Sequence, residues 1–244
     1  KEYHRVLFYK NMSDGSTPWN FKLVEGEILK ADGKEIELHA PRIEVADIDG
    51  DGKLDLITAE QNGKISLFRN VGTRTAPVLA AGVRIAQTGG HAGVKVADFT
   101  GDGLPDLVVG DLWGGGPDHA HPGLHARLCR NVGSKTEPKF EDADAEHGAP
   151  FTEEFQACDM GRQNWVRAVD WNNDGKTDLV ASSENGIVYF YRNLADELFP
   201  IFAPGQPVIS DCGGAARVNI CDWNSDGRKD LIVANMAGEV RLFL

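Results

Sequence analysis

The sequence predicts an all-β fold, a β-propeller of four-stranded antiparallel blades with at least four blades in the ring. Three observations support this fold class. An Asp-rich segment recurs four times without gaps, two of the three intervals between its copies are about fifty residues long, and alternating or apolar runs of strand length fill the intervals. Four short strands in about fifty residues are the content of one propeller blade.

The repeated segment has the pattern D-x-[DNT]-x-D-G-x-x-D. Its copies are DIDGDGKLD, DFTGDGLPD, DWNNDGKTD and DWNSDGRKD, which begin at Asp47, Asp98, Asp170 and Asp222. A second landmark has the same period, namely an apolar run that ends in Arg-Asn, at Asn70, Asn131 and Asn193. The interval after the second copy is about twenty residues longer, and about ten of the extra residues precede the landmark of that blade.

Each copy follows an alternating run such as IEVAD and precedes an apolar run such as LDLITA, so it joins the first strand of a blade to the second. We expect a single domain over residues 1–244, with blades beginning near residues 40, 91, 163 and 215. Residues 1–39 would form the end of a preceding blade, since VLFYKN, which ends at Asn11, matches the third-strand landmark.

The two ends of the chain leave two alternatives for the ring. The chain stops at RLFL, which is also third-strand sequence. Either the ends join to close a four-bladed ring, or the chain is a fragment of a larger ring of seven or eight blades. Because both ends present the same third strand, we expect the second alternative, in which a missing chain or segment completes the propeller.

The repeated segment offers oxygen ligands at alternate positions, which is typical of calcium loops, because Ca²⁺ takes roughly six to eight oxygens. We expect side chains at positions one, three, five and nine and the carbonyl at position seven to bind about four structural Ca²⁺ ions, with Gly at position six allowing the sharp turn. The expected ligands are Asp47, Asp49, Asp51, Lys53, Asp55; Asp98, Thr100, Asp102, Leu104, Asp106; Asp170, Asn172, Asp174, Lys176, Asp178; and Asp222, Asn224, Asp226, Arg228, Asp230. An EF-hand is excluded, because position twelve lacks its Glu and strands flank the loop.

Composition excludes several classes of protein. A net charge of −12 argues against nucleic acid as a partner, and bound Ca²⁺ would offset much of that charge. No apolar run approaches the roughly 18 residues of a membrane span, so no membrane insertion is expected, and the first residues show no signal-peptide pattern. Cys129 and Cys221 lie in strand-like runs and are expected to be buried thiols, whereas a disulfide between Cys158 and Cys212 is left open.

With four in-register copies of this loop, the chain resembles the FG-GAP/VCBS repeats of integrin-type and bacterial secreted β-propellers. The resemblance implies that calcium is structural and braces the link between first and second strands. It also implies a secreted protein in an extracellular or periplasmic setting. For function it implies alternatives, since such repeats occur in adhesion proteins, glycan-binding proteins and polysaccharide lyases.

The first strand of each blade lines the central channel of a propeller, and alternate residues of that strand face the channel. Counting back from each first Asp, the channel-facing residues are Arg42, Glu44, Gly93, Lys95, Trp165, Arg167, Arg217 and Asn219. Intervening apolar residues, Ile43 and Val45 among them, are expected to face the blade core. Four cations in one channel favour an anionic ligand such as an acidic polysaccharide, with solvated or salt-bridged side chains as the alternative.

The expected carbohydrate-binding residues combine the channel with its entry loops and with the insertion of the second blade. They are Lys95, Trp113, Asn164, Trp165 and Arg217. The insertion, LWGGGPDHAHPGLHARL, also carries Asp118, His119, His121 and His125, and the alternative for these is a polar surface hairpin.

Two function hypotheses stay open. The first is a secreted, calcium-stabilised propeller that binds glycans or mediates adhesion. The second is a polysaccharide lyase that cleaves uronate-containing glycans by β-elimination, which needs a cation for the uronate carboxylate and groups that exchange protons. For the lyase, we expect catalysis from His91, His119, His121, Arg162 and Arg167.

Overall fold

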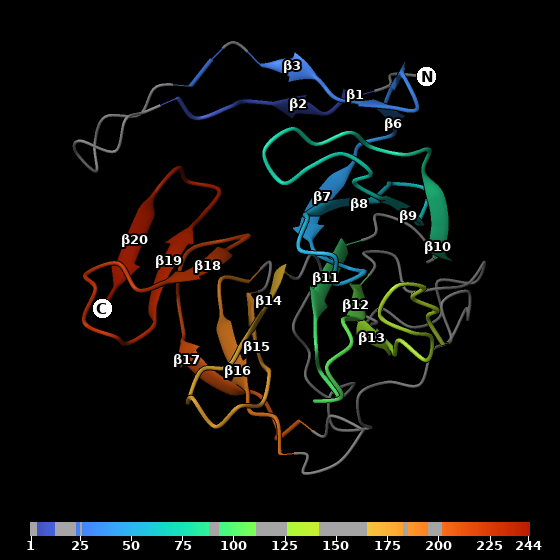
Figure 1. Ribbon diagram of the computed structural model, residues 1–244. Helices are drawn as coiled ribbons and strands as arrows, with labels where there is room; N and C mark the ends of the chain where they lie inside the picture. Colours follow the sequence, from blue (N-terminus) through green and yellow to red (C-terminus); the bar gives the residue numbers. More distant parts are fainter. Residues whose placement is uncertain are drawn as a thin grey trace.

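A computed structural model describes residues 4–12, 23–24, 26–87, 93–110, 126–141, 165–182, 185–194 and 202–244 (Figure 1). Every regular element in this part of the chain is a β-strand, and neighbouring strands pair antiparallel. The predicted all-β class and the predicted antiparallel blades are therefore confirmed.

Four sheets form the blades, and their strands follow one another in chain order. Blade 1 contains β7 (Arg42–Ala46), β8 (Asp55–Ala59), β9 (Lys64–Phe68) and β10 (Val83–Gln87). Blade 2 contains β11 (Gly93–Ala97), β12 (Asp106–Gly110) and β13 (Ala126–Cys129). Blade 3 contains β14 (Trp165–Val169), β15 (Asp178–Ser182), β16 (Val188–Tyr191) and β17 (Gln206–Ile209). Blade 4 contains β18 (Arg217–Cys221), β19 (Asp230–Ala234) and β20 (Val240–Phe243).

Residues ahead of blade 1 form three short two-stranded sheets. The pairs are β1 (His4–Arg5) with β6 (Glu37–Leu38), β2 (Leu7–Phe8) with β3 (Glu27–Ile28), and β4 (Lys30–Ala31) with β5 (Lys34–Glu35). Asn11 forms an antiparallel bridge with Leu23 just as Asn70 does with Leu79. The segment around Asn11 thus has the local structure of the end of a third strand.

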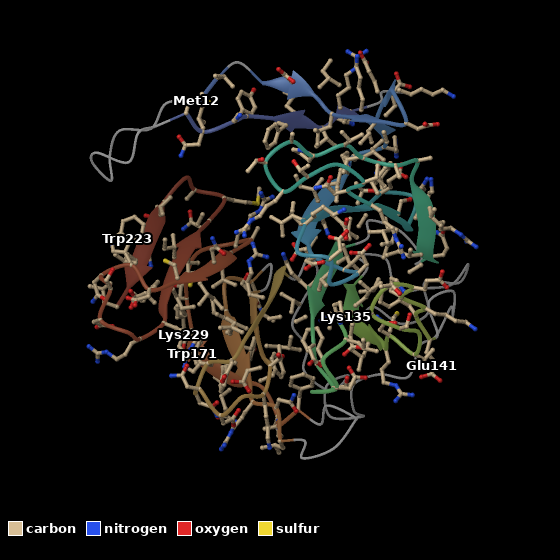
Figure 2. The ribbon with its side chains drawn as sticks, in the orientation of Figure 1. Met12, Lys135, Glu141, Trp171, Trp223 and Lys229 are labelled. Atoms are coloured by element: carbon tan, nitrogen blue, oxygen red, sulfur yellow. The ribbon has the colours of Figure 1, made fainter. Side chains whose placement is uncertain are left out.

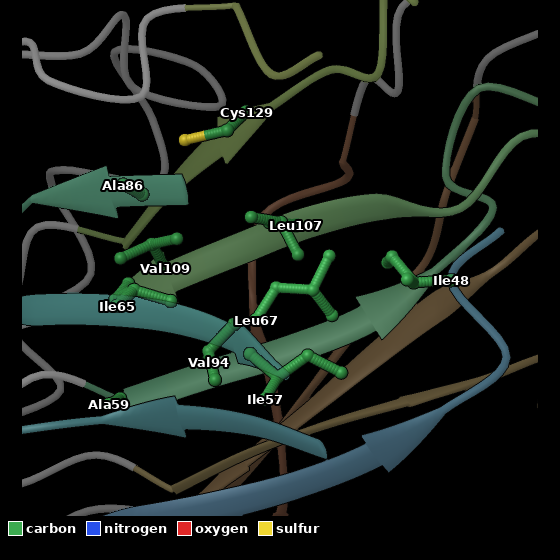
Figure 3. Close-up of a cluster of buried hydrophobic side chains, with 10 residues drawn as sticks. All are labelled: Ile48, Ile57, Ala59, Ile65, Leu67, Ala86, Val94, Leu107, Val109 and Cys129. Atoms are coloured by element: carbon green, nitrogen blue, oxygen red, sulfur yellow. The ribbon is translucent and has the colours of Figure 1, made fainter. Parts of the chain in front are cut away.

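The first strands lie side by side, β7 beside β11, β11 beside β14 and β14 beside β18, so that the blades fan out from one axis (Figure 1). Between neighbouring blades lies an apolar cluster, because each central strand is covered on both faces. Figure 3 shows the cluster between blades 1 and 2, where Ile57 and Leu67 meet Val94 and Leu107. Equivalent clusters join blade 2 to blade 3 and blade 3 to blade 4.

One expectation about buried side chains is wrong. Ile43 and Val45 of β7 were expected in a blade core, but they are 53% and 52% exposed, because the residues ahead of blade 1 cover β8 and β9 and leave β7 open. The disulfide left open for Cys212 is not formed, since Cys212 is a buried free thiol. Cys129 is buried and free as predicted, and Cys221 is free and half-buried.

Candidate metal loops and channel residues

Each Asp-rich segment forms the turn between the first and second strands of its blade, and its backbone is left-handed at two positions. In blade 1 these are Gly50 at position four, with φ 68°, and Gly52 at position six, with φ 82°. Position six is Gly in every copy, as the sequence analysis required, whereas position four carries Asn173 and Ser225 in blades 3 and 4 with φ of 59° and 60°. The left-handed turn at position four is a feature that the sequence analysis missed.

The first Asp of each segment folds back over the turn. Asp47 accepts hydrogen bonds from the amides of Asp51 at 3.1 Å and of Gly52 at 2.9 Å. In the other three segments the amide of the position-six Gly donates to the first Asp at 2.8, 3.0 and 2.9 Å. These bonds hold the first carboxylate over the concave side of the turn, where a cation would be enclosed.

The Asp at position nine is buried and ties two distant parts of its blade together. Asp178 is fully buried, and its two oxygens accept from the amides of Trp171 at 3.0 Å and Asn193 at 2.8 Å. Asp55 and Asp106 make the same pair of bonds, to Ile48 and Asn70 and to Phe99 and Asn131. The amides at Asn70, Asn131 and Asn193 belong to the landmark after the third strand, so one carboxylate joins the Asp-rich loop to that landmark.

The landmark Asn has a role of its own, which the sequence analysis used only as a marker. Its side-chain Oδ1 accepts from two amides in the connection to the fourth strand, for Asn70 from Gly72 at 3.0 Å and Val78 at 3.1 Å. Asn131 does the same with Gly133 and Lys139. The sequence Asn-Val-Gly follows the third strand in blades 1 and 2, and this recurrence could have indicated a structural role for the Asn.

The pKa values of the loop carboxyls are shifted in opposite directions at positions nine and five. Desolvation raises the pKa of the buried Asp55, Asp106 and Asp178 above the usual range, and neighbouring loop carboxylates raise it further. At position five, by contrast, hydrogen bonds to the Arg228 side chain and amide lower the pKa of the exposed Asp226 to about 2. The loops of blades 1 to 3 therefore each contain a buried carboxyl whose raised pKa disfavours ionisation unless a positive charge lies next to it.

The donor atoms of the first two loops fit a hard cation. In the first loop, ligand atoms of Asp47, Asp49 and Asp55 lie within 4.8 Å of one another. In the second loop, the Thr100 hydroxyl at position three is buried and makes no hydrogen bond within the described residues. A cluster of carboxylates and an orphaned hydroxyl oxygen match the all-oxygen ligand set that Ca²⁺ prefers.

Loops of neighbouring blades are also in direct contact. The Thr177 hydroxyl in the loop of blade 3 donates to the carbonyl of Asp98 in blade 2 at 2.9 Å. The Lys229 ammonium in blade 4 donates to the Asn173 side chain in blade 3 at 2.7 Å. Figure 2 labels Lys229 of the blade 4 loop and Trp171 of the blade 3 loop.

Charged side chains of the innermost strands meet near the axis. Lys95 forms an ion pair with Glu44 of the neighbouring blade. Arg167 donates from Nε to the Asn219 side chain at 3.3 Å and from Nη1 to the carbonyl of Val166 at 3.1 Å.

Two arginines of this group are partly desolvated. Burial lowers the pKa of Arg42, and the charge of Arg217 lowers it further, so these guanidinium groups of blades 1 and 4 are neighbours. Burial also lowers the pKa of Arg167, while the Glu44 carboxylate acts in the opposite direction. Among the described residues, four cations and one carboxylate thus gather from four different blades.

Several predicted site residues lie outside the described residues. These are His91, Trp113, Asp118, His119, His121, His125, Arg162 and Asn164, together with Cys158. Trp165 begins β14 and pairs with Ser182, but its side chain is outside the described part. The roles predicted for all of these residues stay predictions, as does the carbonyl ligand at Lys53, Leu104, Lys176 and Arg228.

Comparison with known proteins finds one family model, described as an FG-GAP-like repeat, which matches residues 47–109 and 170–242. No curated protein matches the sequence. Among solved structures, the chain is similar to BBS1N in a complex with ARL6DN soaked with mercury, with 14% identity, a TM-score of 0.38 and coverage of 84% of this chain and 57% of that one. It is also similar to the Photorhabdus luminescens Tc holotoxin pore, with 13% identity, a TM-score of 0.34 and coverage of 99% of this chain and 13% of that one. The chain thus spans little more than half of the first structure, and at this similarity neither structure indicates what the chain binds.

Proposed function

Because the chain belongs to the family of FG-GAP-like repeats, we propose that it is a calcium-braced β-propeller that binds an anionic glycan through the cations of its innermost strands. The observation that carries the binding function is the set of four cations, Arg42, Lys95, Arg167 and Arg217, which come from the innermost strands of four neighbouring blades.

The calcium part of the proposal rests on the loops. The converging oxygens of Asp47, Asp49 and Asp55 and the buried Thr100 hydroxyl would contact the ion, and the buried position-nine carboxylates would carry the compensating negative charge. A bound Ca²⁺ supplies positive charge that offsets the repulsion among these carboxylates. It takes no part in ligand chemistry under this proposal.

The glycan part of the proposal rests on charge and geometry at the axis. Arg42 and Arg167 are half-buried, and their burial weakens competition from water for an anionic group. Glu44 forms an ion pair with Lys95, and the guanidinium groups are the cations that would contact the anionic ligand. A uronate or sulfate group on a polysaccharide matches this arrangement, because guanidinium groups bind oxyanions through paired hydrogen bonds.

An extracellular or periplasmic location follows from the same proposal, since such loops would bind Ca²⁺ in compartments where its free concentration is high. Within the described residues no helix has the length and apolar character needed to cross a membrane.

Calcium binding is tested by thermal unfolding with excess EDTA and then with added Ca²⁺. We expect Ca²⁺ to raise the Tm in proportion to the logarithm of its concentration, and Asp49→Asn to reduce that rise. Mg²⁺ at the same concentration serves as the control, because its smaller and stricter octahedral shell fits such a loop poorly. A Tm that does not respond to Ca²⁺ would overturn the calcium part.

Glycan binding is tested by calorimetric titration with polygalacturonate and with a neutral glucan. We expect salt-dependent binding of the anionic polymer alone, weakened roughly tenfold by Arg167→Gln, since a hydrogen bond to a charged group contributes about 1.5–3 kcal/mol. Arg241→Gln is the matched control, because Arg241 lies on β20, is exposed, and forms an ion pair with Glu239 in the turn before that strand. Equal binding of both polymers, or no effect of Arg167→Gln, would refute the proposed site, and release of unsaturated product would convert it into a lyase site.

A further inference from the structure

An arginine precedes the landmark Asn after the third strand of blades 1, 2 and 3, and in two of these blades it reaches the Asp-rich loop. In blade 1 the Arg69 guanidinium forms an ion pair with Asp49 at 3.7 Å. In blade 3 Arg192 forms an ion pair with Asp174 at 3.5 Å. Two loops therefore hold an arginine of their own blade next to carboxylates that are candidate calcium ligands.

The equivalent arginine of blade 2 is bonded to a different carboxylate. Arg130 donates from Nε to Glu141 at 3.1 Å, and the two side chains form an ion pair. The place of Glu141 in the blade is fixed, because its amide donates to the Arg130 carbonyl at 2.8 Å. In blades 1 and 3 an alanine makes the same backbone bond to the arginine, namely Ala80 and Ala203. Since alanine cannot hold a guanidinium group, the residue at this place accounts for the two directions of the arginine.

Position seven of the loop is a second source of a paired cation. In the first loop Lys53 forms an ion pair with Asp51 at 2.7 Å. In the fourth loop Arg228 donates to Asp226 from Nε at 3.1 Å and from Nη2 at 2.7 Å. The second loop has the uncharged Leu104 at this position.

The second loop thus differs from the others in its charge. Within the part of the chain that the structure describes, its three carboxylates, Asp98, Asp102 and Asp106, form no ion pair with Lys or Arg, whereas four carboxylates share two cations in the first loop and three share one in each of the third and fourth. The Thr100 hydroxyl of the second loop is also buried without a hydrogen-bond partner among the described residues. A buried oxygen of this kind is an independent reason to expect a cation there.

We propose that the paired Lys and Arg side chains compete with Ca²⁺ for their loops, and that the second loop, which lacks them, binds the ion most tightly of the four. This inference rests on the calcium binding proposed above and adds the order in which the loops fill. A cation that stays beside its loop repels the incoming ion, and one that moves away gives up an ion pair. Glu141 is a positioning residue, because it keeps Arg130 away from the loop of its own blade.

The size of the effect follows from charge. A unit charge about 6 Å from a divalent ion changes the binding constant roughly tenfold in an exposed site, and salt reduces this factor. Glu141→Ala gives blade 2 the residue of blades 1 and 3, so it should weaken the second loop by about five- to tenfold. Ala203→Glu is the reciprocal change, since it offers Arg192 a carboxylate away from Asp174, and it should strengthen the third loop by a similar factor.

The test is a titration of the 244-residue chain with Ca²⁺ in competition with a chromophoric chelator, which yields a dissociation constant for each step. Asp102→Ala removes a ligand of the second loop and assigns the tightest step. Glu239→Ala is the matched control for Glu141→Ala, because it also releases an arginine, Arg241, that belongs to no Asp-rich loop. Tm values in EDTA establish that each variant folds.

We expect Asp102→Ala to abolish the tightest step, Glu141→Ala to weaken it and Glu239→Ala to leave every step unchanged. In Ala203→Glu a weaker step should tighten. If the parent chain binds Ca²⁺ but the tightest step survives Asp102→Ala, the proposed order is overturned while calcium binding stands. An unchanged tightest step in Glu141→Ala, with or without a lower Tm in EDTA, would overturn the positioning role of Glu141. A parent chain without any Ca²⁺ step would overturn the calcium part of the proposed function and this inference with it.

Discussion

Replacing the position-nine Asp of blade 3 separates two roles that one carboxylate combines. Asp178→Ala removes an acceptor that is fully buried and holds the amides of Trp171 and Asn193. Asp174→Ala removes an exposed carboxylate of the same loop, whose oxygen accepts from the Lys176 amide at 2.9 Å. Both residues are candidate calcium ligands, but only Asp178 ties the loop to the landmark.

The magnitude follows from the two buried bonds. Each hydrogen bond to a charged acceptor contributes about 1.5–3 kcal/mol, and the relief of a buried charge offsets part of the loss, so we expect Asp178→Ala to cost about 2–4 kcal/mol without metal. In a chain of this size 1 kcal/mol shifts the Tm by about 2–4 °C, which gives a fall of about 4–16 °C. For Asp174→Ala without metal we expect less than about 1 kcal/mol.

The assay is thermal unfolding followed by circular dichroism, for both variants and the parent chain, in EDTA and again with saturating Ca²⁺. In EDTA only Asp178→Ala should lower the Tm. With Ca²⁺ both variants should show a smaller gain than the parent, because each lacks one oxygen ligand. If Asp174→Ala and Asp178→Ala lower the Tm equally in EDTA, the reasoning about the buried tie is refuted.

Three further predictions follow from the same structure. Burial raises the pKa of Asp106 above its unfolded value, so in EDTA the parent chain should lose stability relative to Asp106→Asn as the pH rises above about 4. A series of Tm values measured at different pH tests this, and a Tm difference between the two proteins that does not change with pH would contradict it. Phe99 at loop position two is 3% exposed and packs against blade 3, whereas Trp223 at the same position of blade 4 is 56% exposed. Urea unfolding should therefore show a loss of stability of about 3–5 kcal/mol for Phe99→Ala and under about 1 kcal/mol for Trp223→Ala, and similar losses would contradict this. Gly72→Ala would bring a Cβ within 2.5 Å of the Ala76 carbonyl oxygen, so urea unfolding should show a loss of about 1–3 kcal/mol, and an unchanged midpoint would contradict the close approach.

The blades and their loops could be predicted because the sequence patterns that specify them are local and repeat along the chain. A run of alternating residues, an Asp-rich turn and an apolar run follow one another four times, and each pattern sets its own backbone. The sharp turn at position six could be predicted, because all four copies have Gly there. The left-handed backbone at position four was missed, because Asn173 and Ser225 adopt this conformation although their residue types do not require it.

The features that sequence reasoning missed depend on residues far apart in the chain. Asp55 reaches the amide of Asn70 only after β8 and β9 have paired, and no local spacing specifies that bond. The exposure of Ile43 depends on what covers the sheet, so an apolar pattern alone predicts burial wrongly. At the axis, alternation placed Lys95 and Glu44 on channel-facing positions, but their ion pair requires the relative placement of two blades.

The contact between neighbouring loops gives Asp98 two tasks. Its carboxylate folds over its own turn, while its carbonyl accepts the Thr177 hydroxyl of the next blade. A shift of either loop therefore moves the other through a single residue. If the loops bind Ca²⁺ as proposed, an ion in the second loop would alter the affinity of the third, and the hydrogen bond of Lys229 to Asn173 would connect the fourth loop to the third.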